Sequence, residues 1–224
     1  MKKLSRKNNF SYLFASLLIF LFSAGVVAEL TNFVTKGALT AIIILMLVAS
    51  MRSLHTDITW KHTVWVLLPV FLVLSILDHL FNNQLYMFLV LCTLLVFFIG
   101  SFAMAIHQVL FEGDIDINKI IGSLTLYILL GLIWAVIYMI LMVIDPTAFS
   151  GVEVTSWQEG FARMAYYSFV TLTTLGYGDI LPKNHVAEFF VYMEAIIGVF
   201  YMAIIVSSLI SLRLATIQEA RKGK

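Results

Sequence analysis

The chain of 224 residues is 61% hydrophobic and only 12% charged, and its mean hydropathy is +0.98. Soluble domains are about half apolar and about a quarter charged, so this composition indicates an integral membrane protein and excludes a soluble enzyme or an extended nucleic-acid binder. The net charge of +1 favours neither an acidic nor a basic partner. The single cysteine, Cys92, can form neither an intrachain disulfide nor a metal site by itself.

Six apolar stretches are long enough to cross a hydrocarbon core of roughly 30 Å as helices. In chain order they cover residues 11–28, 33–51, 63–81, 85–106, 121–144 and 187–212. The expected fold is therefore an all-α integral membrane protein with six transmembrane helices. The first stretch has a second interpretation, because its basic start, apolar core and small residue before Glu29 also fit a cleavable signal peptide.

Lys and Arg are distributed unevenly between the two sides that six spans imply. With a cytoplasmic N-terminus, all but three of the 14 basic residues fall on the inner side, and the three outer ones are Lys36, Arg163 and Lys183. Inner loops of membrane proteins carry this excess of positive charge. The pattern predicts a multi-pass protein of the cell membrane with both termini in the cytoplasm.

A polar stretch over residues 150–185 separates the last two spans and is too short to cross by itself. Residues 157–174 have apolar residues at helical spacing and are long enough for a half-membrane helix. The run Thr-Thr-Leu-Gly-Tyr-Gly-Asp follows at residues 173–179, before the last span. We therefore expect a re-entrant pore helix and an extended return. Irregular backbone at membrane depth is tolerated where it is buried in protein or lines a water-filled path.

The extended run has the composition of an ion path. Successive carbonyl oxygens can replace the hydration shell of a cation if the backbone alternates in conformation, so that the oxygens face one way. Gly176 and Gly178 permit a positive φ without a side-chain clash. Thr174 adds a hydroxyl below the carbonyls, and Tyr177 is expected to point away from the path as a packed strut.

The sequence from Thr174 to Asp179 resembles the potassium-channel signature, with Leu175 where Val or Ile is usual. The context agrees, since a pore helix precedes the run and an inner helix follows it, and the resemblance extends over about residues 121–212. It implies that four chains form a homotetramer around one pore, because one chain supplies one filter segment. It also implies a selectivity filter in which K⁺, the permeant ion, is bound by the carbonyls of Thr174, Leu175, Gly176 and Tyr177 and by the Thr174 hydroxyl, with Gly178 completing the filter.

Four residues are expected to support this filter: Thr173, Tyr166, Tyr167 and Asp179. The two tyrosines occupy positions where the family often has two aromatic residues behind the filter, and the phenol of Tyr166 would replace the usual indole donor. The other interpretation is ordinary aromatic packing at the membrane interface. Asp179 at the outer mouth would raise the local cation concentration.

The last span supplies the expected inner cavity and gate. Gly198 lies where the family often has a hinge glycine, and bending during gating and close packing against the pore helix are both open for it. Counting from Gly198 at helical spacing, the cavity face consists of Val199, Met202, Val206, Ser207 and Ile210. Glu194, an acid well inside the span, is interpreted as a structural hydrogen-bond partner or as a proton sensor.

The resemblance divides the chain into a four-span region with a cytoplasmic linker (1–120), a pore domain (121–212) and a short tail (213–224). Residues 85–106 contain no Lys or Arg, which argues against an arginine-type voltage sensor in the fourth span. The twelve residues after Leu212 are too few for a soluble regulatory domain.

The predicted function is passive, potassium-selective conduction that is not classically voltage-gated, with no enzymatic activity and no cofactor. The expected partners are K⁺, membrane lipid and further copies of the chain, and no nucleic acid. Three alternatives are a non-selective cation pore, a subunit of a potassium-uptake transporter, and a membrane enzyme or scaffold that keeps a non-conducting pore.

Overall fold

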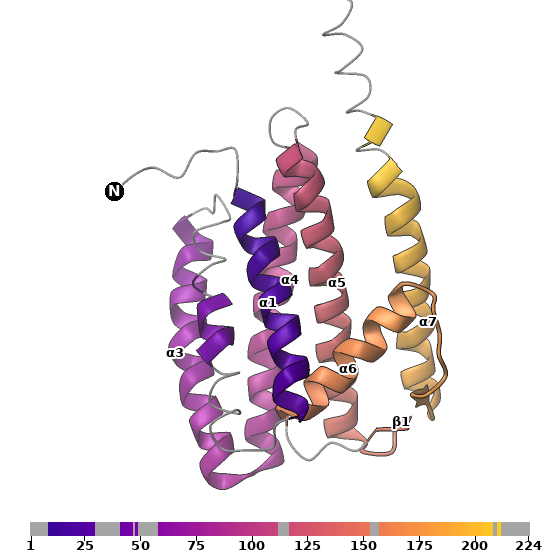
Figure 1. Cartoon of the computed structure of the whole chain (residues 1–224). Helices are drawn as coiled ribbons and strands as arrows, with labels where there is room; N and C mark the ends of the chain where they lie inside the picture. The colour runs from indigo at the N-terminus through magenta and orange to yellow at the C-terminus, as the bar shows by residue number, and fades with distance from the viewer. Residues whose placement is uncertain are drawn as a thin grey trace, which may run out of the picture.

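The computed structural model describes residues 9–29, 41–46, 48, 58–111, 117–152, 157–207 and 210–211. The named helices are α1 (Asn9–Glu29), α3 (Ile58–Phe81), α4 (Gln84–Phe111), α5 (Ile117–Ile144), α6 (Trp157–Leu172) and α7 (His185–Phe200), which continues as the π-helix η1 (Tyr201–Val206). Two short strands, β1 (Phe149–Ser150) and β2 (Leu181–Pro182), pair antiparallel. Residues 41–46 are also helical. The helices form an upright bundle in which α6 lies obliquely beside α7 (Figure 1).

Among the described residues, four helices are long and apolar enough to cross a membrane. They are Trp60–Phe81, Gln84–Phe111, Asn118–Ile144 and His185–Ile204, and Phe10–Val26 is a shorter apolar helix. The four overlap the predicted spans 63–81, 85–106, 121–144 and 187–212. The predicted second span, 33–51, lies mostly outside the described residues. The protein is thus an all-helical membrane protein, as its composition predicts.

Contacts at the two ends of α5 fix the directions of the other helices. At its start, the backbone N–H of Phe10 in α1 donates to the Asn118 side chain, 3.2 Å away. At its end, the Gln84 side chain, in the turn between α3 and α4, donates to the carbonyl of Val143. Helices α1 and α3 therefore run parallel to α5, and α4 runs antiparallel to them (Figure 1).

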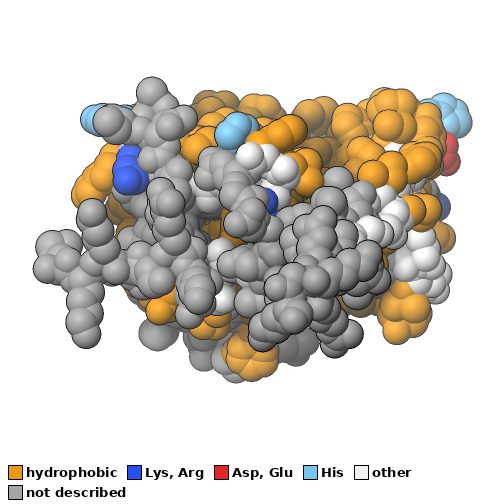
Figure 2. Space-filling view, turned by 90° about the horizontal axis from the view of Figure 1, so that it is seen from above, with side chains coloured by type: hydrophobic (Ala, Val, Ile, Leu, Met, Phe, Trp, Pro, Cys, Tyr) orange, Lys and Arg blue, Asp and Glu red, His pale blue; other side chains and the backbone are white. Residues whose placement is uncertain are grey.

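The core lies around α5, because this helix is apolar on all sides and neighbours pack on several of its faces. In its span, 61% of the most apolar stretch is buried, against 22% in the span of α7. Viewed along the bundle, exposed hydrophobic side chains are spread around the rim of the molecule (Figure 2). Helix α7 is therefore far more exposed in the single chain than α5.

Helix α7 returns antiparallel to α5 and is held at both ends. At its N-terminus, the Asn184 side chain accepts from the backbone N–H of Ala187 at 2.8 Å and donates to Asp145 at 2.7 Å. A side-chain oxygen at this position satisfies a helix N–H that has no partner within the helix. At the other end, the phenol of Tyr201 donates to the carbonyl of Ser123 near the start of α5.

Candidate functional site

Helix α6 carries the chain into the depth of the bundle and ends there. Its 16 residues rise about 24 Å, too little to cross the hydrocarbon core. The buried Phe161 contacts the Phe20 ring of α1, with ring centroids 5.3 Å apart. At the other end of α6, the phenol of Tyr127 in α5 donates to the Leu172 carbonyl at 3.1 Å. Tyr127 lies ten residues into α5, so α6 ends well inside the bundle.

The last turn of α6 is hydrogen-bonded to the residues that follow it. The backbone N–H of Thr174 donates to Thr171 at 2.9 Å, and those of Leu175 and Gly176 both donate to Val170, at 2.9 and 3.2 Å. These bonds satisfy carbonyls that a helix end leaves without partners. They also reverse the chain, so that residues 173–179 lead back towards β2.

The returning segment alternates in backbone conformation. Thr174, Gly176 and Gly178 have φ values of +60°, +57° and +78°, whereas Leu175 and Tyr177 between them do not have positive φ. A positive φ is readily accessible to glycine but is an outlier for a β-branched residue such as Thr174. Such strain persists where the surroundings enforce it, and it gathers at functional sites. An alternating backbone is what a row of carbonyls needs in order to face one way, as expected from the sequence.

The carbonyl oxygens of this segment are open to a ligand. Among the described residues, none donates a hydrogen bond to the carbonyls of residues 174–178. All residues from 173 to 179 are exposed in the single chain, and the side chains of Leu175 and Tyr177 are 56% and 66% exposed. Backbone carbonyls normally find a partner. A row of accessible carbonyls therefore forms a site for water or a cation.

The two tyrosines predicted behind the filter are placed differently. Tyr166 donates from its phenol to the carboxylate of Asp179 at 2.8 Å, which links α6 to the outer end of the segment. Tyr167 is buried instead, with its ring 5.3 Å from that of Tyr138 and 5.5 Å from that of Phe149. Of the two tyrosines, only Tyr166 makes a described hydrogen bond to the 173–179 segment, and its partner Asp179 is one of the predicted support residues and not one of the predicted filter residues. Thr173 donates from its hydroxyl to the Phe169 carbonyl at 2.6 Å.

Replacing Tyr166 by Phe removes the donor to Asp179 and keeps the ring. We expect little change in stability, because an exposed contact to a charged group contributes little. If the segment is the predicted selectivity filter, we also expect a larger share of sodium in the cation flux, since the outer end of the segment loses a hydrogen bond to α6. The measurement is the reversal potential in mixed sodium and potassium. Tyr12→Phe, at an exposed tyrosine of α1, is the matched control, and an unchanged sodium share in Tyr166→Phe would contradict this role of the hydrogen bond.

The predicted cavity residues lie on α7, η1 and the residues after it. Val199, Met202, Ser207 and Ile210 are exposed in the single chain, and the side chain of Val206 lies outside the described residues. The prediction assumed an α-helix throughout. The π-helix over Tyr201–Val206 changes the rise and rotation per residue, so the stripe counted at α-helical spacing does not continue unchanged past it.

Gly198 is a close-packing position in this structure. It is buried, and a Cβ added to it would lie 2.5 Å from the carbonyl oxygen of Leu172 and 3.0 Å from the Leu172 Cδ1. The missing side chain lets α7 approach the end of α6, directly before the extended segment. This contact supports the packing interpretation of Gly198.

Glu194 is completely buried, with an exposed fraction of 0%. Its carboxyl group contacts the hydroxyl of Ser168 at 2.5 Å and accepts from the phenol of Tyr138. The sequence interpretation missed Ser168 and Tyr138, and it also missed the Tyr127 and Tyr201 bonds. The available signal was a set of polar side chains inside otherwise apolar spans, which are expensive there and need partners.

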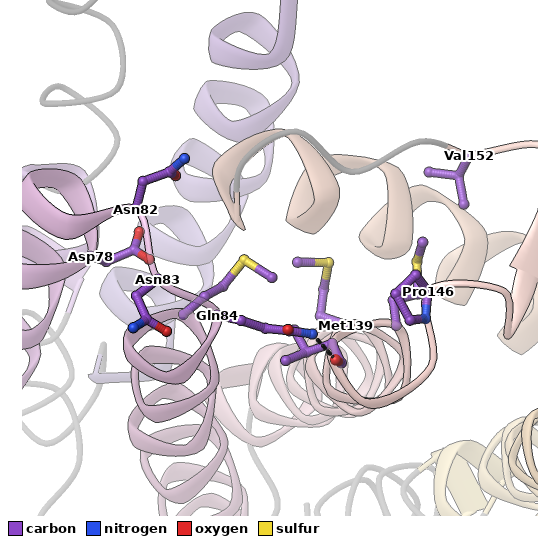
Figure 3. Close-up of a pocket in the computed structure, with 10 residues that line it drawn as sticks. Asp78, Asn82, Asn83, Gln84, Met139, Pro146 and Val152 are labelled. Carbon is purple, nitrogen blue, oxygen red and sulfur yellow. Dashed lines mark hydrogen bonds between the residues drawn. The ribbon is translucent and has the colours of Figure 1, made fainter.

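A separate cavity of about 430 Å³ lies where α3 turns into α4 and where α5 ends (Figure 3). Its lining combines amide, carboxylate, thioether and aliphatic side chains: Asp78, Asn82, Asn83, Gln84, Met87, Met139, Met142, Val143, Pro146 and Val152. The amide of Gln84 points to the Val143 carbonyl across one wall. No residue of the 173–179 segment lines this cavity, so it is a different site from the carbonyl row.

Comparison with known proteins gives a match in the region just described. Residues 124–213 match the family model described as "Ion channel", which covers about three quarters of α5 and the whole of α6, the extended segment, α7 and η1. No match was found among curated proteins or among solved structures. The match covers less than half of the chain and supports an ion channel, a membrane protein.

Proposed function

We propose that the protein is a potassium-selective channel that conducts K⁺ passively through a homotetrameric pore. The observation that carries the proposal is the backbone of residues 174–178, where every second φ is positive and no described donor reaches a carbonyl. Four such segments around one axis would surround a dehydrated cation with rings of oxygen. In this arrangement Thr174, Leu175, Gly176 and Tyr177 supply the K⁺ sites, and Gly178 holds the outer end.

The tetramer is supported by the surface of α7. Its exposed apolar side chains include Phe189, Ile196 and Val199, and the neighbouring Leu175 and Tyr177 are exposed as well. Uncovered apolar surface of this kind marks an interface or a lipid contact. In the tetramer, the side chains of Leu175 and Tyr177 pack against the neighbouring chain, while their carbonyls face the axis.

We place the protein in the cell membrane with six crossings and with both termini in the cytoplasm. One end of the bundle holds the start of α1, the start of α5 and the end of η1 (Figure 1). In the sequence, most Lys and Arg residues lie close to these helix ends. Helix α4 carries no Lys or Arg, so the proposed channel lacks an arginine-type voltage sensor. Helices α3 and α4 then serve as a lipid-facing collar.

The test is ion flux into liposomes that contain the purified full chain, driven by a potassium gradient. Sodium replaces potassium in a parallel sample, and barium is added as a blocker. The proposal expects potassium flux that barium inhibits and little sodium flux. Equal sodium and potassium flux would favour the non-selective pore, and an intact tetramer without flux under varied pH, voltage and lipid would overturn the channel assignment.

A further inference from the structure

Glu194 joins three helices at a point that water does not reach. Its side chain lies on α7, one carboxyl oxygen contacts Ser168 of α6 at 2.5 Å, and the other accepts from Tyr138 of α5. Both partners are neutral hydroxyl groups. A buried carboxylate without a cation is expensive, because the neutral surroundings do not replace the hydration of the charge.

The protonation state of the Glu194 carboxyl group follows from the number of protons that its hydrogen bonds require. The Oγ of Ser168 makes two short contacts, 2.7 Å to the carbonyl oxygen of Gly131 and 2.5 Å to Glu194 Oε1. A carbonyl oxygen only accepts, and an ionised carboxylate also only accepts, so the single hydroxyl proton of Ser168 cannot satisfy both contacts. The Tyr138 proton belongs on Glu194 Oε2. The contact between Ser168 and Glu194 therefore needs a third proton, and a neutral carboxyl group is its source.

The same contact sets the register between α6 and α7. Glu194 and Gly198 are four residues apart on α7, and their partners Ser168 and Leu172 are four residues apart on α6. Residues four apart lie on the same face of a helix. One turn of α7 is thus matched to one turn of α6 immediately before Thr174, so a shift at Glu194 moves the start of the extended segment.

We propose that Glu194 is a neutral carboxylic acid that donates its proton to Ser168 and thereby positions the end of α6 against α7. Glu194 is a positioning residue, because it acts on the carbonyl row through Ser168. Its effect on flux rests on the proposed channel function, whereas its protonation does not.

Within the part of the chain that the structure describes, no positively charged group interacts with Glu194 to replace the proton. The titratable side chains that interact with it electrostatically are the phenols of Tyr127 and Tyr138 from α5 and of Tyr167 from α6. If Glu194 loses its proton, the single hydroxyl proton of Ser168 has to serve two acceptors, the Gly131 carbonyl and an anionic carboxylate oxygen. One of the two contacts then lacks a hydrogen bond, which weakens the register between α6 and α7.

Infrared difference spectroscopy on the full chain in lipid tests the proton directly. A neutral carboxylic acid has a C=O stretching band that carboxylates lack. We expect this band in the wild-type protein at neutral pH, its loss in Glu194→Gln, and its survival in Glu188→Gln, which changes an exposed acid of the same helix. A wild-type spectrum without the band at neutral pH would overturn the proposal.

Thermal melting and ion flux distinguish the effect of the Glu194 proton from the effect of having any side chain at position 194. Glutamine also donates to Ser168 and accepts from Tyr138, so we expect Glu194→Gln to melt near the wild type and to keep its flux within about twofold. Glu194→Ala should melt lower, or fail to fold. At alkaline pH the wild-type flux should fall together with the infrared band, while Glu194→Gln keeps its flux.

A Glu194→Gln protein that melts as low as Glu194→Ala, or that loses flux at the same alkaline pH as the wild type, would contradict the proposal. If the wild type itself conducts no ions, the channel function fails, but the infrared band and the melting comparison still decide whether Glu194 carries the proton. The two failures are therefore separable.

Discussion

We expect Gly178→Ala to abolish the proposed potassium-selective flux while the proposed tetramer still assembles, which is the largest effect among our predictions. Gly178 has a φ of +78°, and a Cβ added there meets no atom within 4 Å, so the conflict is conformational and not steric. A left-handed conformation costs an L-residue about 1–2 kcal/mol, or about 4–8 kcal/mol over the four copies in one ring. The ring relaxes by turning its carbonyls, which removes the K⁺ coordination. Liposome flux measures the loss of potassium-selective conduction, and size-exclusion chromatography measures whether the tetramer assembles.

The control for this change is Gly25→Ala in α1. A Cβ at Gly25 also meets nothing within 4 Å, but Gly25 is helical and has no positive φ. Alanine at a helical position is favoured over glycine by up to about 1 kcal/mol, so the control should keep its flux and melt no lower than the wild type. Normal selectivity in Gly178→Ala would remove Gly178 from the conducting segment.

Gly198→Ala is expected to lower both the melting temperature and the potassium flux. The new Cβ would lie 2.5 Å from the Leu172 carbonyl oxygen, and a backbone atom cannot yield as a flexible side chain does. Overpacking of this kind typically costs about 1–3 kcal/mol. The strain falls on the last residue of α6, so it shifts the start of the extended segment. Melting in lipid and liposome flux are the measurements.

This variant also separates the two roles that the sequence leaves open for Gly198. A glycine that serves only as a hinge would tolerate alanine without loss of stability, because alanine favours the straight helix. In that case Gly198→Ala would melt at or above the wild-type temperature and would change only the opening of the pore. Gly25→Ala again provides a helical glycine in open space for comparison.

The membrane spans and the candidate ion path could be predicted because they depend on local sequence. Apolar length alone identifies a spanning helix, and the predicted spans at 63–81 and 121–144 coincide with α3 and α5 to within a few residues. The pore helix predicted over 157–174 ends at Leu172 in the structure. The positive φ at Gly176 and Gly178 follows from the residue type, whereas the positive φ at Thr174 runs against its type and comes from the closing turn of α6.

By itself, the sequence determined an all-helical membrane protein with a short helix and a glycine-containing return before its last span, since hydrophobicity and backbone freedom are properties of neighbouring residues. The tertiary structure decided what the isolated polar residues do. Glu194 meets partners 26 and 56 residues away, on helices whose relative register no local pattern encodes. The contacts of Gly198 and Glu194 likewise depend on which atoms lie across the interface between α6 and α7, and only the tertiary structure shows those atoms.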